Sequence, residues 1–206
     1  MAVQPVHGHV AHDEHVDHQG NANLAVWLGL IALTFTTATF VATNVYLRAW
    51  SPAKFDLSPL KLQGLPYQTM LFLLISGVLL FIAGAFFVRN AWHGFRVTLA
   101  LTTLSFFAVL VLQFRIMVWF TYASKQIATI YTPSAFIEFA LVVLSVILLA
   151  IGGWFASFAS KRRINRFFPV AMNVWLYTVF AGIVMMLLEN VMTVGEFAAW
   201  CGQHLT

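Results

Sequence analysis

The fold is decided by residues 95–160, which read FRVTLALTTLSFFAVLVLQFRIMVWFTYASKQIATIYTPSAFIEFALVVLSVILLAIGGWFASFAS. The stretch consists of two long apolar runs joined by a short polar link. Each run carries one ionisable residue, Arg115 in LSFFAVLVLQFRIMVWF and Glu138 in TPSAFIEFALVVLSVILLAIGG. A charged side chain at the centre of a bilayer helix costs about 2.5–3.5 kcal/mol on insertion scales, so such residues are usually paired or placed for function.

The composition of the whole chain indicates a membrane protein. Of its 206 residues, 61% are hydrophobic and 9% are charged, whereas soluble domains carry about 25% charged residues. A water-soluble core of this length could not bury so much apolar surface, so lipid is the expected solvent. The net charge of +4 lies mostly in links between apolar runs, which suits a membrane surface and not nucleic acid. The single cysteine, Cys201, excludes an internal disulfide, and residues 1–20 show no signal-peptide pattern.

The apolar runs predict an all-α, polytopic membrane protein with a bundle of five transmembrane helices. We expect these helices at residues 24–47, 67–88, 97–120, 133–158 and 168–193. They form one membrane domain, residues 23–194, between a disordered, histidine-rich polar tail of residues 1–22 and a short C-terminal tail of residues 195–206.

Prolines and small residues add detail to this prediction. Thr132 before Pro133 is typical of a helix start, with a threonine cap and a proline at the first helical position. Every proline after residue 50 is expected in a link or at a helix start: Pro52, Pro59, Pro66, Pro133 and Pro169. Small residues recur in the second helix and predict a close helix–helix contact there: Ser76, Gly77, Ala83 and Gly84.

The histidines do not predict a metal site. Five of the seven lie in the N-terminal tail, interleaved with carboxylates: His7, His9, His12, His15 and His18. Histidine and carboxylate side chains can ligate divalent ions, but a solvated tail is the favoured interpretation. His93 between two helices is interpreted as a headgroup contact, and Cys201 with His204 has half of a metal-site spacing and no second half.

Tryptophans near the ends of the predicted helices are candidates for interfacial anchors, because indole rings concentrate at the level of the lipid headgroups. They are Trp27, Trp50, Trp92, Trp119 and Trp154.

Arg115, Glu138 and Glu189 are predicted to lie in one leaflet. Arg115 comes near the end of the third helix, Glu138 near the start of the fourth and Glu189 near the end of the fifth. With Gln113, they are the candidates for an intramembrane ion pair or a lipid contact, and Arg115 is expected to pair with Glu138, Glu189 or both. Structural bonding between helices is the favoured role; a proton or ion path and headgroup anchoring by Arg115 are the alternatives.

The order of these features resembles subunit III of the haem–copper oxidases in its five-helix bacterial form. The resemblance covers about residues 24–193 and includes LPYQTMLFLLISGVLL, LQFRIMVWF and the closing FFPVAMNVWLYTVF. The chain departs from the family where the family usually has a carboxylate near 113–115, His-Gly-x-x-His at SAFIE (134–138) and Trp-His with an acid at MNVW (172–175). No functional residue of the family is therefore carried over to a residue of this chain.

The resemblance implies a subunit without catalytic residues, cofactor-binding residues or metal ligands of its own. It would pack beside the catalytic subunit I and other oxidase subunits, which would hold the haem and copper. It would bind phospholipid and support proton uptake during oxygen reduction by cytochrome c or quinol. The implied place is the bacterial cytoplasmic membrane, and six Lys and Arg residues against four in the links favour a cytoplasmic N-terminus and a periplasmic C-terminus.

Two other functions remain open. An accessory or quinone-site subunit of another respiratory complex could place a quinone between Trp175 and Tyr177. A small transporter component would usually show an internal repeat and helices broken by glycine or proline at the midplane, and the sequence predicts neither.

Overall fold

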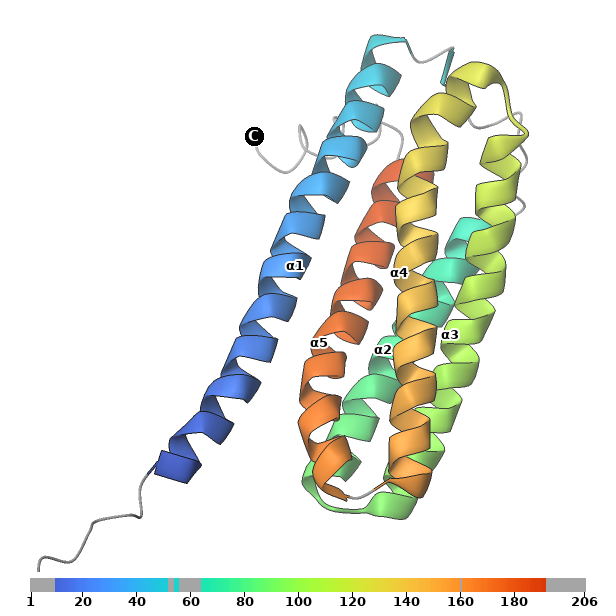
Figure 1. The fold of residues 1–206 in the computed structure, drawn as a ribbon. Coiled ribbons are helices and arrows are strands. Elements are labelled where there is room, and N and C mark those ends of the chain that lie inside the picture. Colours follow the sequence, from blue (N-terminus) through green and yellow to red (C-terminus); the bar gives the residue numbers. More distant parts are fainter. Residues whose placement is uncertain (1–9, 52–53, 56–63, 160, 192–206) are drawn as a thin grey trace, which may run out of the picture.

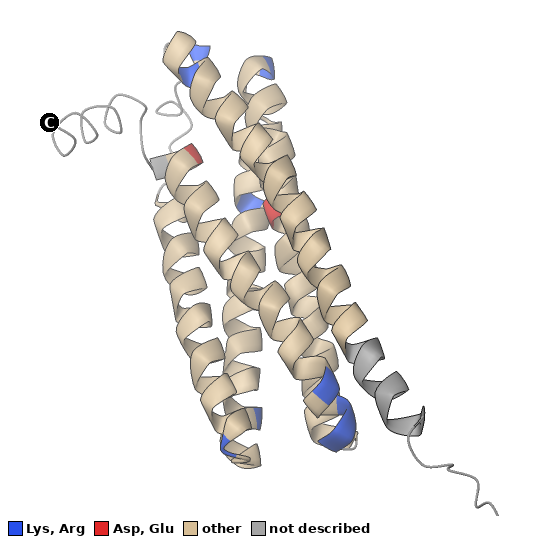
Figure 2. Cartoon of the chain, turned by 90° about the vertical axis from the view of Figure 1, so that its left-hand side faces the viewer, with Lys and Arg blue, Asp and Glu red and all other residues tan. Residues whose placement is uncertain are grey.

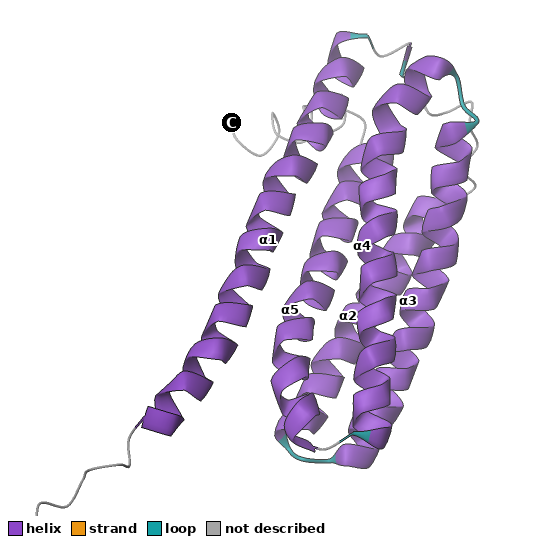
Figure 3. Cartoon of the chain, in the orientation of Figure 1, coloured by secondary structure: helices purple, strands orange, loops and turns teal. Residues whose placement is uncertain are grey.

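The computed structural model describes residues 10–51, 54–55, 64–159 and 161–191, with the backbone alone for residues 10–19 and 191. The described part contains α1 (Val10–Trp50), α2 (Leu65–Val88), α3 (Trp92–Thr121), α4 (Lys125–Phe158), α5 (Lys161–Met186) and the π-helical turn η3 (Leu187–Val191). It contains no strand (Figure 3). Five of these helices are long and apolar enough to cross a bilayer, so the chain is a multi-pass membrane protein, as predicted.

Helices α2 to α5 form an antiparallel bundle, and α1 leans along the side made by α4 and α5 (Figure 1). The links are short, which makes sequential helices antiparallel neighbours. Asn90 turns the chain between α2 and α3 in the left-handed region, at φ 55°, a conformation that asparagine tolerates better than most residues. The ends of α1, α3 and α5 consequently meet the starts of α2 and α4 at one end of the bundle (Figure 1).

Two hydrophobic clusters fill the bundle. The larger joins α2, α3, α4 and α5 and contains tilted and edge-on ring pairs, among them those of Phe87, Phe95 and Phe168. The smaller lies toward the other end and includes Ile116, Phe120 and Tyr131. Aromatic pairs of this kind contribute about 0.5–1.5 kcal/mol beyond their buried area.

The predicted small-residue contact of α2 is confirmed. Ser76 donates a hydrogen bond of 2.8 Å to Ser105 of α3. Gly77 lies so close to α5 that a Cβ atom there would be 3.2 Å from Cγ1 of Val179. Small side chains let helix backbones approach in lipid, where packing replaces the hydrophobic effect as the attraction between helices.

Two predicted helix starts are wrong. Helix α4 begins at Lys125, with Ser124 at the N-cap, and α5 begins at Lys161, so Pro133 and Pro169 lie inside helices. An interior proline costs about 3 kcal/mol in a solvated helix because it removes one N–H donor and clashes with the preceding turn. In a bundle within lipid, neighbouring helices re-satisfy the freed groups, and the backbone has no better alternative than helix.

The N-terminal boundary also differs from the prediction. Helix α1 begins at Val10, so its helical backbone includes residues 10–22 of the predicted polar tail. Once a helix has nucleated in the membrane, each added residue gains a backbone hydrogen bond, and the helix can run on beyond the lipid. Residues 1–9, the side chains of the remaining tail histidines, and the pair Cys201 and His204 lie outside the part of the chain that the structure describes.

Candidate functional site: a buried polar layer

Buried polar atoms without a hydrogen-bond partner gather at one end of the described bundle. In the part of the chain whose side chains are described, six buried nitrogen and oxygen atoms lack a hydrogen-bond partner. They are Nδ2 and Oδ1 of Asn44, Oγ1 of Thr132, Oε1 of Glu138, Oε1 of Glu189 and Oδ1 of Asn190. All belong to the end of α1, the first half of α4 and η3, which meet at that end. We call this region the polar layer; buried groups without partners are rare in proteins and require an explanation.

Glu138 of α4 is held by Gln113 of α3. Nε2 of Gln113 donates a hydrogen bond to Oε2 of Glu138, and both side chains are buried, Glu138 with 4% of its surface exposed. The structure therefore brings together two of the four predicted intramembrane residues. The partner of this carboxyl group is a neutral amide, which stabilises it without compensating a charge.

Glu189 lies in the π-helical turn η3, with 1% of its surface exposed. Oγ of Ser134 donates a hydrogen bond of 2.8 Å to its Oε2. Ser134 precedes Glu138 by four residues, about one helical turn, so both face the same side of α4, about 6 Å apart along its axis. The two carboxyl groups are close enough to interact electrostatically, and Figure 2 shows both acidic positions in the same half of the bundle.

Arg48 of α1 completes the polar layer. Its Nη1 donates hydrogen bonds to the backbone carbonyls of Leu188 (3.1 Å) and Glu189 (3.0 Å). A cation at this place satisfies carbonyl groups that a helix leaves without partners at its C-terminal end and opposes the negative end of the helix dipole. The guanidinium also attracts the carboxylate of Glu189.

The predicted pairing of Arg115 with either glutamate is wrong for this chain. Arg115 is exposed on the outer face of α3, and the described residues include no hydrogen bond or ion pair to it. Each helical residue advances by about 100°, so a residue two positions after the buried Gln113 lies about 200° away and faces outward. A lipid contact, the alternative role predicted for Arg115, stays a prediction. The cation near Glu189 is Arg48.

Sequence reasoning missed Arg48 because it lay beyond the predicted first helix. The spacing of residues along α1 could have shown that Arg48 faces the bundle. Leu30, Thr37 and Asn44 are buried at intervals of seven residues, and Arg48 follows Asn44 by four, which places it on the same helix face.

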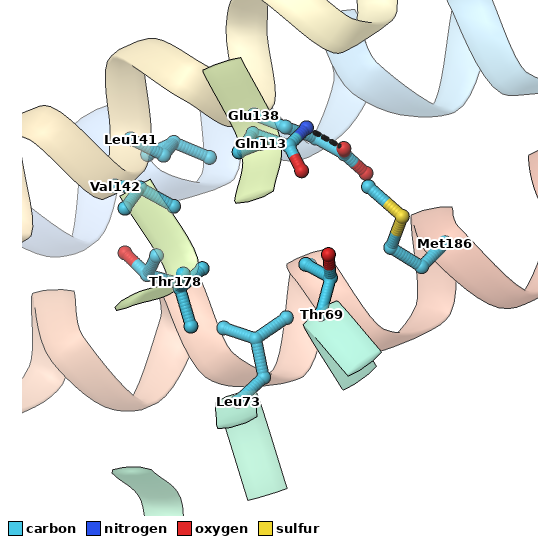
Figure 4. A pocket seen from close by; sticks show the side chains of 10 residues that line it. Thr69, Leu73, Gln113, Glu138, Leu141, Val142, Thr178 and Met186 are labelled. Carbon is cyan, nitrogen blue, oxygen red and sulfur yellow. Dashed lines mark hydrogen bonds between the residues drawn. The ribbon is translucent and has the colours of Figure 1, made fainter. Parts of the chain in front are cut away.

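A small cavity lies next to Glu138. Its walls include Thr69, Leu73, Gln113, Glu138 and Met186, from four elements (Figure 4). The cavity has about the room that one water molecule needs. Its surface is almost entirely apolar, and Glu138 is the only acid among the residues that line it.

Hydrogen bonds between polar side chains join helix α1 to α5. Asn173 donates a hydrogen bond of 3.3 Å to Asn23, and Thr34 donates one of 3.1 Å to the Tyr177 hydroxyl. Of the 18-residue apolar segment of α1 that could cross the membrane, only 11% is buried inside the bundle, against 39% for the corresponding segment of α3. Much of α1 therefore faces outward.

The remaining candidates occupy different environments. Trp50, Trp119 and Trp154 are exposed near helix ends, as interfacial anchors would be, and Trp27 is exposed well inside α1. Trp92 is half-buried, with the ammonium of Lys161 5.3 Å from its ring. Trp175 is fully buried, and its indole N–H donates to the carbonyl of Ser145, so it offers no open face to a quinone.

Among the described residues, no three His, Cys, Asp or Glu side chains converge as metal ligands would. No protein-family model, curated protein or solved structure matched this chain. Function is therefore inferred from the described residues, which form a membrane bundle with buried, unpartnered polar atoms at one end and a largely exposed first helix.

Proposed function

We propose that the chain is a non-catalytic membrane subunit of a respiratory haem–copper terminal oxidase, of the subunit III type. In this proposal it sits in the bacterial cytoplasmic membrane, packs beside the oxygen-reducing subunit, binds phospholipid and supports assembly and proton uptake. The order of the five helices and the sequence resemblance support the family. The surface of α1 supports the role as a subunit of a larger complex.

The exposed face of α1 is the observation that carries this proposal. Ala32, Thr36, Thr39 and Thr43 form a stripe of small, exposed residues along it. The three threonine hydroxyls donate to backbone carbonyls of their own helix, at 2.8–3.1 Å. The hydroxyls of the stripe are therefore already hydrogen-bonded, and its side chains are small. Both properties favour close approach by a helix of another subunit. We name these four residues the α1 stripe.

The side chains that the structure describes do not fit a haem or copper centre. The sole histidine between residues 19 and 203 is His93, and it is exposed at the turn where α3 begins. An axial haem ligand or a copper site needs histidine, cysteine or methionine side chains that converge within the bundle. The proposal accordingly assigns the redox cofactors to neighbouring subunits.

A small transporter component is a second candidate that specific observations favour. Pro133 lies inside α4 close to Glu138, and a π-helical turn interrupts the end of α5 at Glu189. Irregular helices beside buried acids are typical of transport sites. Among the described residues, however, α4 runs unbroken through Pro133 and the π-helical turn lies at the end of α5, so neither is the midplane break that the sequence did not predict.

The decisive experiment is purification of the chain from its own membrane through an affinity tag at the N-terminus. We expect the tagged chain to co-purify with haem and copper, with a reduced-minus-oxidised haem spectrum and cyanide-sensitive oxygen consumption. Thr39→Trp in the α1 stripe should lower the haem recovered per tagged chain. Phe81→Trp, on the exposed face of α2, is the matched control and should not.

A colourless chain that purifies alone from native membranes in mild detergent would overturn the oxidase proposal. If that chain also moves ions across proteoliposomes, the transporter component is the correct function.

A further inference from the structure

Helix α1 contacts the rest of the bundle through few buried side chains. Among its described residues, three are buried: Leu30, Thr37 and Asn44. Helix α3 buries ten. The fully buried part of the α1 contact is therefore one leucine, one hydroxyl and one amide, and Figure 1 shows α1 on the outside of the bundle, inclined to α5.

Asn44 contributes no hydrogen bond to this contact. Its side chain is completely buried, and neither Nδ2 nor Oδ1 has a hydrogen-bond partner. An amide in this state is as poorly satisfied against protein as it would be against lipid chains. Movement of α1 away from the bundle would therefore lose no hydrogen bond at Asn44.

In the described part of the chain, side-chain hydrogen bonds connect α1 to α5 and η3 at three places along its length. The pairs are Asn23 with Asn173, Thr34 with the Tyr177 hydroxyl, and Arg48 with the backbone carbonyls of Leu188 and Glu189. A hydrogen bond between membrane helices shifts the equilibrium between contact and separation by about threefold on average. A few such bonds hold α1 in place without fixing it permanently.

Lipid does not oppose separation of α1 from the bundle. Lipid chains are as apolar as leucine side chains, so an apolar helix face gains no hydrophobic stabilisation by leaving lipid for protein. The hydroxyls of Thr36, Thr39 and Thr43 donate to carbonyls of α1 itself, and its backbone bonds are internal. Helix α1 is therefore a stable transmembrane element with or without the bundle.

We propose that α1 is a movable strap, which alternates between a closed position against α4 and α5 and an open position in which lipid separates it from them. The bonds of Arg48 to η3 and of Thr34 to Tyr177 hold the closed position. Opening uncovers the Tyr177 hydroxyl and the carbonyls of Leu188 and Glu189, so the polar layer becomes accessible from the side of α5. The α1 stripe faces away from the bundle, so a subunit bound to it would set the position of the strap.

Distances between two spin labels on the full chain in lipid nanodiscs test this proposal. One label is attached at Leu28→Cys on α1 and the other at Phe81→Cys on α2, in a chain whose own thiol is removed by Cys201→Ser. Both labelled positions are exposed. We expect double electron–electron resonance to show two distance populations. The reference pair, Phe81→Cys with the exposed Ile147→Cys on α4, should show one.

Two variants remove contacts that hold the closed position. Tyr177→Phe deletes one hydroxyl and Arg48→Gln deletes the guanidinium, and each should raise the ratio of open to closed chains by about threefold or more. Arg115→Gln is the matched control, since it removes an exposed cation of α3, and should leave the ratio unchanged. A short bismaleimide that joins Asn23→Cys to Asn173→Cys should remove the open population.

A single distance between α1 and α2 in the native chain, or populations that neither variant shifts, would overturn the proposal. A second population that appears equally in the reference pair would also overturn it, because the whole bundle and not α1 alone would then be changing shape. The measurement uses the chain without other subunits, so its result is separate from the test of the oxidase proposal.

Discussion

Gln113 of α3 donates a hydrogen bond to Glu138 of α4, and this contact joins the two helices at the base of the polar layer. Both side chains are almost completely buried. The contact explains how a helix that must lie in lipid can carry an acid: the acid faces the bundle interior, where an amide from the next helix meets it.

Replacement of Gln113 by leucine should destabilise the bundle by about 1–3 kcal/mol, because it leaves both oxygens of Glu138 without a donor. Unfolding in detergent, followed by circular dichroism, measures the change. Glu138→Leu together with Gln113→Leu should cost less than the sum of the two single changes. Additive costs would show that the two side chains do not stabilise one another.

Arg48→Leu should lower stability by more than about 1 kcal/mol, since it leaves the Glu189 carboxyl and two backbone carbonyls without their cation. Arg115→Leu is the natural comparison, because Arg115 faces outward from α3 in the same half of the bundle. It should change stability by no more than about 0.5 kcal/mol. A larger loss in Arg115→Leu than in Arg48→Leu would contradict the arrangement of the polar layer.

Gly77→Leu should destabilise the bundle by about 1–3 kcal/mol, because added bulk there must displace Val179 of α5. Gly153→Leu is the matched control: it is also a helical glycine, but a Cβ atom there meets nothing within 4 Å. The thermal midpoints of the two variants in one detergent decide the comparison. Equal midpoints would mean that α2 and α5 do not pack closely at Gly77.

The charge bias predicts that the turn before α3 faces the cytoplasm and the turn before α4 faces the periplasm. We would introduce Ala91→Cys or Ser124→Cys into a Cys201→Ser chain and treat intact cells with an impermeant maleimide. Both positions are exposed in their turns. The cysteine at 124 should be labelled from outside, and the one at 91 only after the cells are opened; the reverse pattern would invert the topology.

Most of the fold could be predicted from the sequence, but some helix boundaries could not. The second and third helices begin within five residues of their predicted starts and end within one residue of their predicted ends. The fourth and fifth begin seven or eight residues early, because Pro133 and Pro169 were interpreted as helix starts. A proline favours a helix start when its neighbours are solvated, and whether neighbouring helices support it inside a helix is a property of the packed bundle.

The sequence by itself determined that five segments cross a membrane and that Glu138 and Glu189 lie at similar depth. Both follow from local quantities, the apolar length of each run and the rise per residue. Only the tertiary structure decided which basic residue meets the acids. Arg48 and Arg115 are both near the same end of the bundle, but the rotation of each helix about its axis, set by contacts with its neighbours, turns Arg48 inward and Arg115 toward the surface.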